Sequence, residues 1–373
     1  MRITFIAPGI LGNPSGGSRV IAMYAQRLYD MGHEVCLVHG RGHRPSWREK
    51  LRVFLREGRW PRRLRGRGPY LEQSTVPMIE LESTSDFRDE DIPDADVVIA
   101  TFWTTAEAVA RLAPEKGAKA YFIQDYIIDY VIRCEGGYPV DRVKATWRLP
   151  MHKIVISNWL AGIAEKEYGD TDYSLVPNGV DLELFNALER GKQPVPTVGC
   201  MYSLARLKGI DVAINAVTFA QKKYPSLQSM WFGVSSVNAK LPLPHQSEYF
   251  QNPPQHTLKD IYGKCDAWIF PSRNDGFGLP ILEAMACRTP VVGTPAGAAP
   301  ELLGNGGGLL VEQDNPEAMA EAILDMVGLS DEEWRAVSYV ARKTAESYDW
   351  QQAVTTFEVA LKRAIARSRS EQQ

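Results

Sequence analysis

Residues 267–286 read AWIFPSRNDGFGLPILEAMA, and this stretch predicts a strand, a glycine-rich loop and a helix in succession. The apolar strand ends at Phe270, and Pro280 lies near the first position of the helix, where the missing N–H of proline costs nothing. The same alternation of short apolar runs and amphipathic segments recurs along the whole chain. The other predicted strands lie at 3–7, 35–38, 97–100, 120–123, 153–156, 197–201, 229–233 and 290–292. Short strands that alternate with helices predict parallel βαβ units in open, doubly wound α/β sheets.

A polar, proline-bearing stretch at 186–196 interrupts this alternation and predicts a linker. The pattern of strand, loop and helix starts again directly after it, which indicates two similar α/β domains in tandem. A chain of 373 residues is long enough for two domains that each bury a core. We place an N-terminal domain at 1–180, a hinge or linker at 181–195 and a second domain at 196–350.

The composition is that of an ordinary globular protein, with 23% charged and 45% hydrophobic residues. The net charge of −3 gives no reason to expect nucleic acid binding. The 5 cysteines are scattered, which predicts neither a zinc site nor a disulfide framework and fits a reducing compartment. The N-terminal apolar run is short, and no segment approaches the ~18 apolar residues of a membrane span. We therefore expect a cytoplasmic protein.

One segment departs from this average, because residues 41–67 hold 11 basic and 2 acidic residues, a net charge of +9. Within it, Trp47, Leu51, Phe54 and Leu55 have helical spacing, so the segment is both basic and amphipathic. Such a segment can lie on an anionic membrane surface, at about 1 kcal/mol for each basic residue. The alternative is a surface insertion whose apolar side packs on the N-terminal domain, and the sequence leaves both interpretations open.

The loop and helix start at 271–283 predict an anion site. Unpaired N–H groups at the start of a helix, with Gly276 and Gly278 beside them, suit a diphosphate. Asp275 lies just before this site, and Glu283 lies just inside the helix, eight positions further on. Two carboxylates would repel the anion unless they bind hydroxyl groups, which points to recognition of a sugar and a ribose.

The sequence contains no clear motif for another kind of nucleotide-binding site or for a metal site. The N-terminal glycine-rich loop does not read GxGxxG, and no GxxxxGK[ST] occurs, which excludes the usual dinucleotide oxidoreductase and P-loop sites. Three triplets with two outer aspartates, at 89–91, 94–96 and 170–172, could hold a divalent cation. We interpret them as solvated turns and predict neither a metal nor a cofactor.

Asp275 and Glu283, with GFGLPILEAMA around the second carboxylate, resemble the E-x7-E signature of the family 4 retaining glycosyltransferases, which have the GT-B fold. Three further stretches agree with that family: the NGVD segment in 176–185, the KGxD turn at 208–211 and the glycine pair at 16–17. The resemblance implies two Rossmann-like domains that face each other across a cleft. It also implies that the C-terminal helix, at 351–373, crosses back to the N-terminal domain.

The resemblance implies a role for each matched residue. Glu283 would hold the ribose hydroxyls, Asp275 would contact the donor sugar, and Lys208 would neutralise the leaving diphosphate. The backbone N–H groups that would face the sugar and phosphates belong to Phe277, Gly278 and Leu279. The glycine pair, Gly16 and Gly17, would approach the diphosphate from the other domain.

The sequence departs from the family pattern at several positions. The first carboxylate is an aspartate where the family usually has glutamate, and Ser203 stands where it usually has the diphosphate-binding arginine. Arg206 lies nearby and is either a replacement or a surface residue. Gln124, followed by Asp125 on the acceptor side, stands where the family usually has histidine, and a glutamine cannot titrate as a general base. Arg288 replaces a glycine at a helix end where glycine would be easier.

Together these features predict a metal-independent, retaining hexosyl or deoxyhexosyl transferase that uses a nucleotide-diphospho-sugar. The donor would bind to the second domain, and a glycan, lipid-linked or protein acceptor would bind to the first. We expect a role in the synthesis of cell-surface polysaccharides or glycoconjugates, with peripheral membrane contact through 41–67. The alternatives are a non-catalytic sugar-nucleotide or glycan-binding protein of the same fold, and a GT-B epimerase or phosphorylase.

Overall fold

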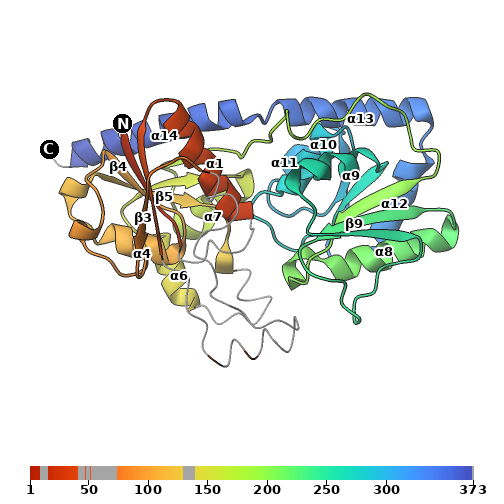
Figure 1. Ribbon diagram of the computed structural model, residues 1–373, viewed down its shortest axis with the longest axis horizontal. Coiled ribbons are helices and arrows are strands. Elements are labelled where there is room, and N and C mark those ends of the chain that lie inside the picture. The colour runs from red at the N-terminus through yellow and green to blue at the C-terminus, as the bar shows by residue number, and fades with distance from the viewer. Residues whose placement is uncertain (9–15, 41–46, 48–50, 52–73, 129–138, 372–373) are drawn as a thin grey trace.

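The computed structural model describes residues 1–8, 16–40, 47, 51, 74–128 and 139–371. Its described part consists of two α/β units, each built on one parallel sheet (Figure 1). The first unit contains the N-terminal sheet, and the second unit contains the sheet formed after residue 196. The α/β class predicted from the alternation of strands and helices is confirmed.

The first sheet has its earliest strand near its centre, as a doubly wound sheet requires. All of its recorded strand pairs are parallel. Its order is β3 (Met78–Leu81), β2 (Glu34–Gly40), β1 (Arg2–Ile6), β4 (Val97–Ala100), β5 (Ala118–Ile123), β6 (His152–Val155) and β7 (Tyr173–Leu175). Residues of the central strands β1 and β4 are almost all buried, because helices cover both faces of a parallel sheet.

The second sheet repeats this arrangement, again with parallel pairs and with its first strand near the centre. Its order is β10 (Ser247–Gln251), β9 (Gln228–Gly233), β8 (Thr197–Met201), β11 (Ala267–Phe270), β12 (Val291–Gly293) and β13 (Gly308–Leu310). The strand β11 is the one that leads into the glycine-rich loop, so this loop leaves the carboxyl edge of the second sheet near its middle.

Helices cover the sheets of both units (Figure 1). Those of the first unit are α1 (Gly16–Asp30), α4 (Trp103–Ala110), α6 (Val140–Thr146) and α7 (Asn158–Tyr168). Those of the second unit are α8 (Ile210–Lys223), α9 (Leu258–Gly263), α10 (Leu279–Ala286), α11 (Ala299–Leu303), α12 (Pro316–Gly328) and α13 (Asp331–Glu346). Among the described helices, none has the length and apolar character that a membrane span requires.

The last helix, α14 (Trp350–Glu371), runs from the second unit back along the first (Figure 1). Two of its aromatic side chains are buried against α1 of the first unit. Trp350 meets the ring of Tyr24 edge-on at 5.3 Å, and Phe357 stacks on the same ring at 4.4 Å. Aromatic contacts of this kind fix the helix on the first unit, so the chain begins and ends in the same unit.

Several elements differ from the sequence-based expectation. The C-terminal helix was expected at 351–373, whereas α14 begins at Trp350, after a short turn at residues 347–349 that separates it from α13. The glycine pair at 16–17 was expected in a loop, but it forms the first turn of α1. The N–H groups of a first helical turn have no acceptor within the helix, and glycine leaves them uncovered by a side chain. Arg288 takes the left-handed conformation, with φ of +60°, at the position where a glycine would be easier.

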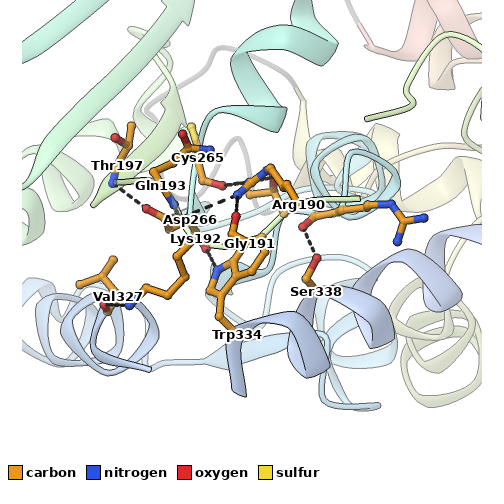
Figure 2. Close-up of polar contacts among 12 residues, drawn as sticks. Arg190, Gly191, Lys192, Gln193, Thr197, Cys265, Asp266, Val327, Trp334 and Ser338 are labelled. Carbon is orange, nitrogen blue, oxygen red and sulfur yellow. Dashed lines mark hydrogen bonds and ion pairs between the residues drawn. The ribbon is translucent and has the colours of Figure 1, made fainter. Parts of the chain in front are cut away.

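The last residues of the predicted linker are fixed on the second unit (Figure 2). Asp266 is fully buried and accepts the backbone N–H of Gln193 at 2.7 Å. The guanidinium of Arg190 lies 3.8 Å from the same carboxylate and 4.5 Å above the ring of Trp334. The Nζ of Lys192 donates to the carbonyl oxygens at the end of α12 and just after it, at 2.6 and 2.5 Å. Residues 190–193 therefore pack as part of the second unit.

Stability is expected to fall below pH 6.5 because of His152. This residue is buried on β6, with its Nε2 2.8 Å from the hydroxyl of Ser174, and burial, with the nearby charge of Arg363, lowers the pKa of His152 to about 4 from an ordinary value of 6.5. Between pH 6.5 and about 4, His152 is therefore protonated in the unfolded chain and neutral in the folded chain. The free energy of unfolding is therefore unaffected by His152 above pH 6.5 and decreases as the pH falls from 6.5 towards 4. The decrease due to His152 is about 2 kcal/mol at pH 5.

Urea unfolding at pH 7 and pH 5 tests this expectation. The His152→Gln variant keeps a hydrogen-bonding group near Ser174 but has no titrating ring, so it should lose about 2 kcal/mol less than the wild type between the two pH values. Equal losses in the two proteins would show that His152 does not cause this part of the acid sensitivity.

Candidate functional site

The start of α10 lies at the end of the glycine-rich loop. Gly278 precedes this helix in the left-handed conformation, with φ of +98°, and a side chain at this position would crowd Ile281 and Phe270. In the described part of the chain, the backbone N–H groups of Gly278 and Leu279 have no hydrogen-bond acceptor. They are therefore available to an anion, and their binding of a diphosphate stays a prediction.

The glycine-rich loop of the second unit contacts the first unit at Gly276. A Cβ atom built on this glycine would lie only 1.7 Å from the carbonyl oxygen of Gln124, which follows β5. The hydroxyl of Ser157 donates to the carbonyl of Gly276 at 3.0 Å. Beside it, the backbone N–H and side-chain amide of Asn158 donate to Glu301 at 2.8 and 2.7 Å. The two units are thus in direct contact around this loop.

The start of α1 approaches the same place from the first unit. A Cβ atom built on Gly16 would lie 3.9 Å from the side chain of Leu279, and one built on Gly17 would lie 3.6 Å from Oε1 of Gln124. The first turns of α1 and α10 therefore come together, each with the positive end of its helix dipole. Glycine at both positions leaves the backbone open to a close approach by a ligand.

A charged pair lies between the loop and the turn that follows β8. The Nζ of Lys208 is 2.5 Å from Oδ2 of Asp275. Burial opposes the charge of Lys208, but the carboxylates of Asp275 and Asp125 outweigh it and raise the pKa of this lysine above its ordinary value. Lys208 is therefore protonated at neutral pH, and its charge is held next to the loop that leads into α10. Asp125, from the first unit, also accepts the N–H of Tyr126 at 2.8 Å.

The position of Lys208 is fixed by backbone conformation and by an arginine clamp. Gly209 separates the short helical turn Arg206–Lys208 from α8 with φ of +63°, and a Cβ atom on it would lie 2.0 Å from the carbonyl oxygen of Pro271. Arg273 binds both carboxylate oxygens of Asp211, at 2.9 and 2.7 Å. Such a bidentate contact is geometrically specific, so the turn and the glycine-rich loop are held in one relative position.

Both carboxylate oxygens of Glu283 have a donor. Arg19, from the first turn of α1, forms an ion pair with Oε1, and the hydroxyl of Tyr262 donates to Oε2 at 2.8 Å. Burial, together with the negative charge of Glu283, raises the pKa of Tyr262 well above its ordinary value. The tyrosine hydroxyl therefore keeps its proton and remains a donor to Glu283.

Three other predicted site residues lie in the second unit. The hydroxyl of Ser203 accepts the N–H of Ala205 at 3.3 Å. Arg206 is exposed, and no partner of its guanidinium is recorded among the described residues, so its binding of a diphosphate stays a prediction. Phe277 has a buried side chain, and its carbonyl accepts the N–H of Ala298 at 3.0 Å.

The sequence-based reasoning missed three side chains that hold the site together, namely Arg19, Tyr262 and Arg273. For Arg273, a basic residue two positions before the first carboxylate is a usable signal, whereas the contacts of Arg19 and Tyr262 depend on packing between distant segments. It also missed Asn274, a buried residue whose amide nitrogen and oxygen both lack a hydrogen-bond partner among the residues that the structure describes. Buried amides are normally paired, so this residue next to Asp275 is unusual.

Two further predictions concern charges away from the centre. The aspartates of two triplets form ion pairs with basic residues, at 2.7 Å for Asp94–Lys116, 3.3 Å for Asp96–Arg2, 2.6 Å for Asp170–Lys153 and 2.5 Å for Asp172–Arg363. The interpretation as solvated turns is wrong for Asp170, whose side chain is largely buried beside Lys153.

The basic segment 41–67 lies outside the described residues except for Trp47 and Leu51, which are both exposed.

Two doubly wound parallel units, with a final helix that returns to the first unit, make up the GT-B fold, and the chain has this fold. Residues 188–344 match the family model described as glycosyl transferases group 1. The matched range contains Lys208, Asp275 and Glu283, whereas Arg19 and the glycine pair at 16–17 lie outside it.

Among solved structures, a sucrose-phosphate synthase from Thermosynechococcus elongatus aligns with a TM-score of 0.74 at 17% identity, covering 98% of this chain and 99% of that one. HepE from Anabaena, solved in complex with UDP and glucose, aligns with a TM-score of 0.71 at 17% identity, covering 97% and 99%. A D-inositol 3-phosphate glycosyltransferase from Corynebacterium urealyticum is 28% identical over 229 residues, which cover 53% of this chain and 54% of that protein. The chain thus spans about half the length of the curated relatives it matches.

Proposed function

We propose that this protein is a glycosyltransferase that takes its sugar from a nucleotide-diphospho-sugar. The observation that carries the proposal is the approach of the first turns of α1 and α10 beside a protonated lysine. Two helix starts and a lysine make an environment suited to a diphosphate, and the neighbouring carboxylates suit the hydroxyls of a sugar and a ribose. The match of residues 188–344 to the glycosyl transferases group 1 model supports the same function.

In this proposal, each part of the site binds one part of the donor. Lys208 and the N–H groups of Gly278 and Leu279 hold the diphosphate and neutralise its charge as it leaves, whereas the N–H of Phe277 donates to Oδ1 of Asp275 at 3.5 Å. Asp275 binds hydroxyls of the transferred sugar, and Glu283 binds the hydroxyls of the ribose. Gln124 and Asp125 lie on the first unit beside the glycine-rich loop, where an acceptor or the sugar would contact them.

The proposed reaction retains the configuration of the sugar. The acceptor hydroxyl attacks the anomeric carbon on the face from which the diphosphate departs, and a phosphate oxygen of the leaving group takes the acceptor proton. The site then has to position the two substrates and stabilise the developing negative charge, with no enzyme nucleophile. The positive charge of Lys208 and the helix starts serve that purpose without a metal ion.

We further propose that the acceptor is a growing glycan or glycoconjugate, and that the segment 41–67 brings the enzyme to an anionic membrane surface. The net charge of +9 and the exposed Trp47 and Leu51 support this contact. A variant without 41–67 should lose binding to phosphatidylserine vesicles and keep its binding of nucleotides. Equal vesicle binding by both forms would contradict the membrane contact.

A thermal-shift screen against UDP, GDP, ADP, dTDP and their common sugar conjugates tests the donor class, with and without a chelator. A ligand at about 100 times its dissociation constant adds about 2.7 kcal/mol to the stability, which is easily measured. We expect one nucleotide to raise the melting temperature, with no effect of the chelator, and its sugar conjugate to be consumed when a suitable acceptor is present. A screen without any shift would overturn the proposed function.

A further inference from the structure

An ion pair joins the two units at the carboxylate that is predicted to bind ribose. Arg19 lies in the first turn of α1, and its guanidinium pairs with Oε1 of Glu283 on α10. The Arg19 side chain is 13% exposed and the Glu283 side chain 5%, so this is a largely buried contact between units. The two residues are 264 positions apart in the sequence.

The contacts fix Glu283 in one orientation. Arg19 binds one oxygen from the first unit, and Tyr262 donates to the other oxygen from within the second unit. A carboxylate offers about four lone-pair directions, and the donors among the described residues use two of them, so two are left for a ligand. A buried carboxylate without a cation would be strongly destabilising, and Arg19 supplies the opposite charge that offsets the burial of Glu283.

We propose that Arg19 is a positioning residue for nucleotide recognition, because it fixes Glu283 from the opposite unit so that its free lone pairs bind the ribose hydroxyls. This inference rests on the proposed function and deepens it. It means that the nucleotide subsite is built by both units, although Glu283 and Tyr262 belong to the second. The ability to distinguish ribose from a sugar without hydroxyls then depends on a residue outside the family range 188–344.

A simpler role for Arg19 would be to hold the two units together without any part in ribose recognition. The two roles predict different effects on ligands. A structural clip affects every nucleotide equally, because it changes only how the units are arranged. A positioning residue affects the ribose contact alone, because its loss lets the carboxylate turn while the diphosphate contacts stay in place.

The experiment measures, by calorimetry, the binding of UDP, GDP and ADP and of their 2′,3′-dideoxy counterparts to the full-length protein. The variants are Arg19→Met, Arg19→Lys and, as a matched control on the same helix, Arg27→Met. We expect the wild type to prefer the ribonucleotide, and Arg19→Met to bind it about 10- to 100-fold more weakly, as the loss of a charge-assisted contact predicts. Binding of the dideoxynucleotide should change little, Arg19→Lys should recover part of the preference, and Arg27→Met should behave as the wild type.

Each other outcome has a definite meaning. A preference for ribose that survives in Arg19→Met, or an equal weakening of both ligands, overturns the inference and leaves the proposed function intact. A wild type that binds none of the three nucleotides overturns the proposed function instead. If Arg19→Met does not fold, the double variant Arg19→Met/Glu283→Gln removes the unpaired charge. Its preference for ribose should equal that of Glu283→Gln alone, and a further loss would contradict the positioning role.

Discussion

Replacement of Lys208 by alanine is expected to slow sugar transfer about 10- to 150-fold. Its ammonium group is the cation that lies beside Asp275 and the glycine-rich loop, where the leaving diphosphate gains negative charge in the proposed reaction. Loss of a charge-assisted contact costs about 1.5 to 3 kcal/mol, and this cost falls on the transition state because the charge of the leaving group is largest there. Steady-state kinetics with the nucleotide sugar identified by the thermal-shift screen measure the effect.

The Lys223→Ala variant is the matched control, because this lysine is exposed on the far end of α8. Its turnover should equal that of the wild type. If Lys208→Ala weakens nucleotide binding and the wild type has no turnover to lose, the protein is a binding module and the transferase proposal is wrong. If turnover persists undiminished in Lys208→Ala, the diphosphate is stabilised by other groups, of which Arg206 is the nearest basic candidate in the sequence.

The α/β class follows from the sequence because the buried central strands are continuous apolar runs. A strand in the middle of a parallel sheet is covered on both faces, so β4 and β11 consist of apolar residues alone, and both were predicted with their observed bounds. Two edge strands were missed for the opposite reason. β7 and β10 contain polar residues and are only partly buried, so their sequences resemble loops.

The candidate site was predictable where its residues are neighbours in the chain. The glycines, Asp275 and Glu283 lie within one loop and helix, so their spacing alone indicates an anion site flanked by carboxylates. The contacts between units were not predictable in this way. The pairing of Arg19 with Glu283 depends on how α1 and α10 approach each other, and no local spacing encodes that approach.

Gly276 also takes part in a contact between the two units that the sequence does not predict. The sequence indicates that the backbone there comes close to something, and a phosphate is the natural interpretation of a glycine at a helix start. In the structure, the atom nearest to its missing side chain is instead the carbonyl oxygen of Gln124 in the other unit. Gly276 therefore sets how closely the two units can meet, and its effect on activity should come through their arrangement.

Replacement of Gly276 by alanine is expected to lower turnover about 100-fold or more. The added methyl group would lie 1.7 Å from the carbonyl oxygen of Gln124, whereas real contacts of a Cβ atom essentially never fall below 3.0 Å. The obstacle is backbone, which cannot rotate away as a side chain would, so the two units must move apart by more than an ångström. A displacement of about 1 Å between reacting groups can cost about 100-fold in rate, because the substrates bound on either unit no longer meet in the reactive geometry.

Kinetics and calorimetry on the same variant separate this cause from simple misfolding. The diphosphate contacts of the second unit should largely survive, so turnover should fall much more than nucleotide affinity. Gly162→Ala is the matched control, since this glycine lies within α7 and no atom of the described residues outside that helix lies within 4 Å of its missing side chain. An alanine there should stabilise the helix by about 0.5 to 1 kcal/mol and leave turnover unchanged. A Gly276→Ala variant with full activity would mean that catalysis does not require the close contact of the two units at this loop.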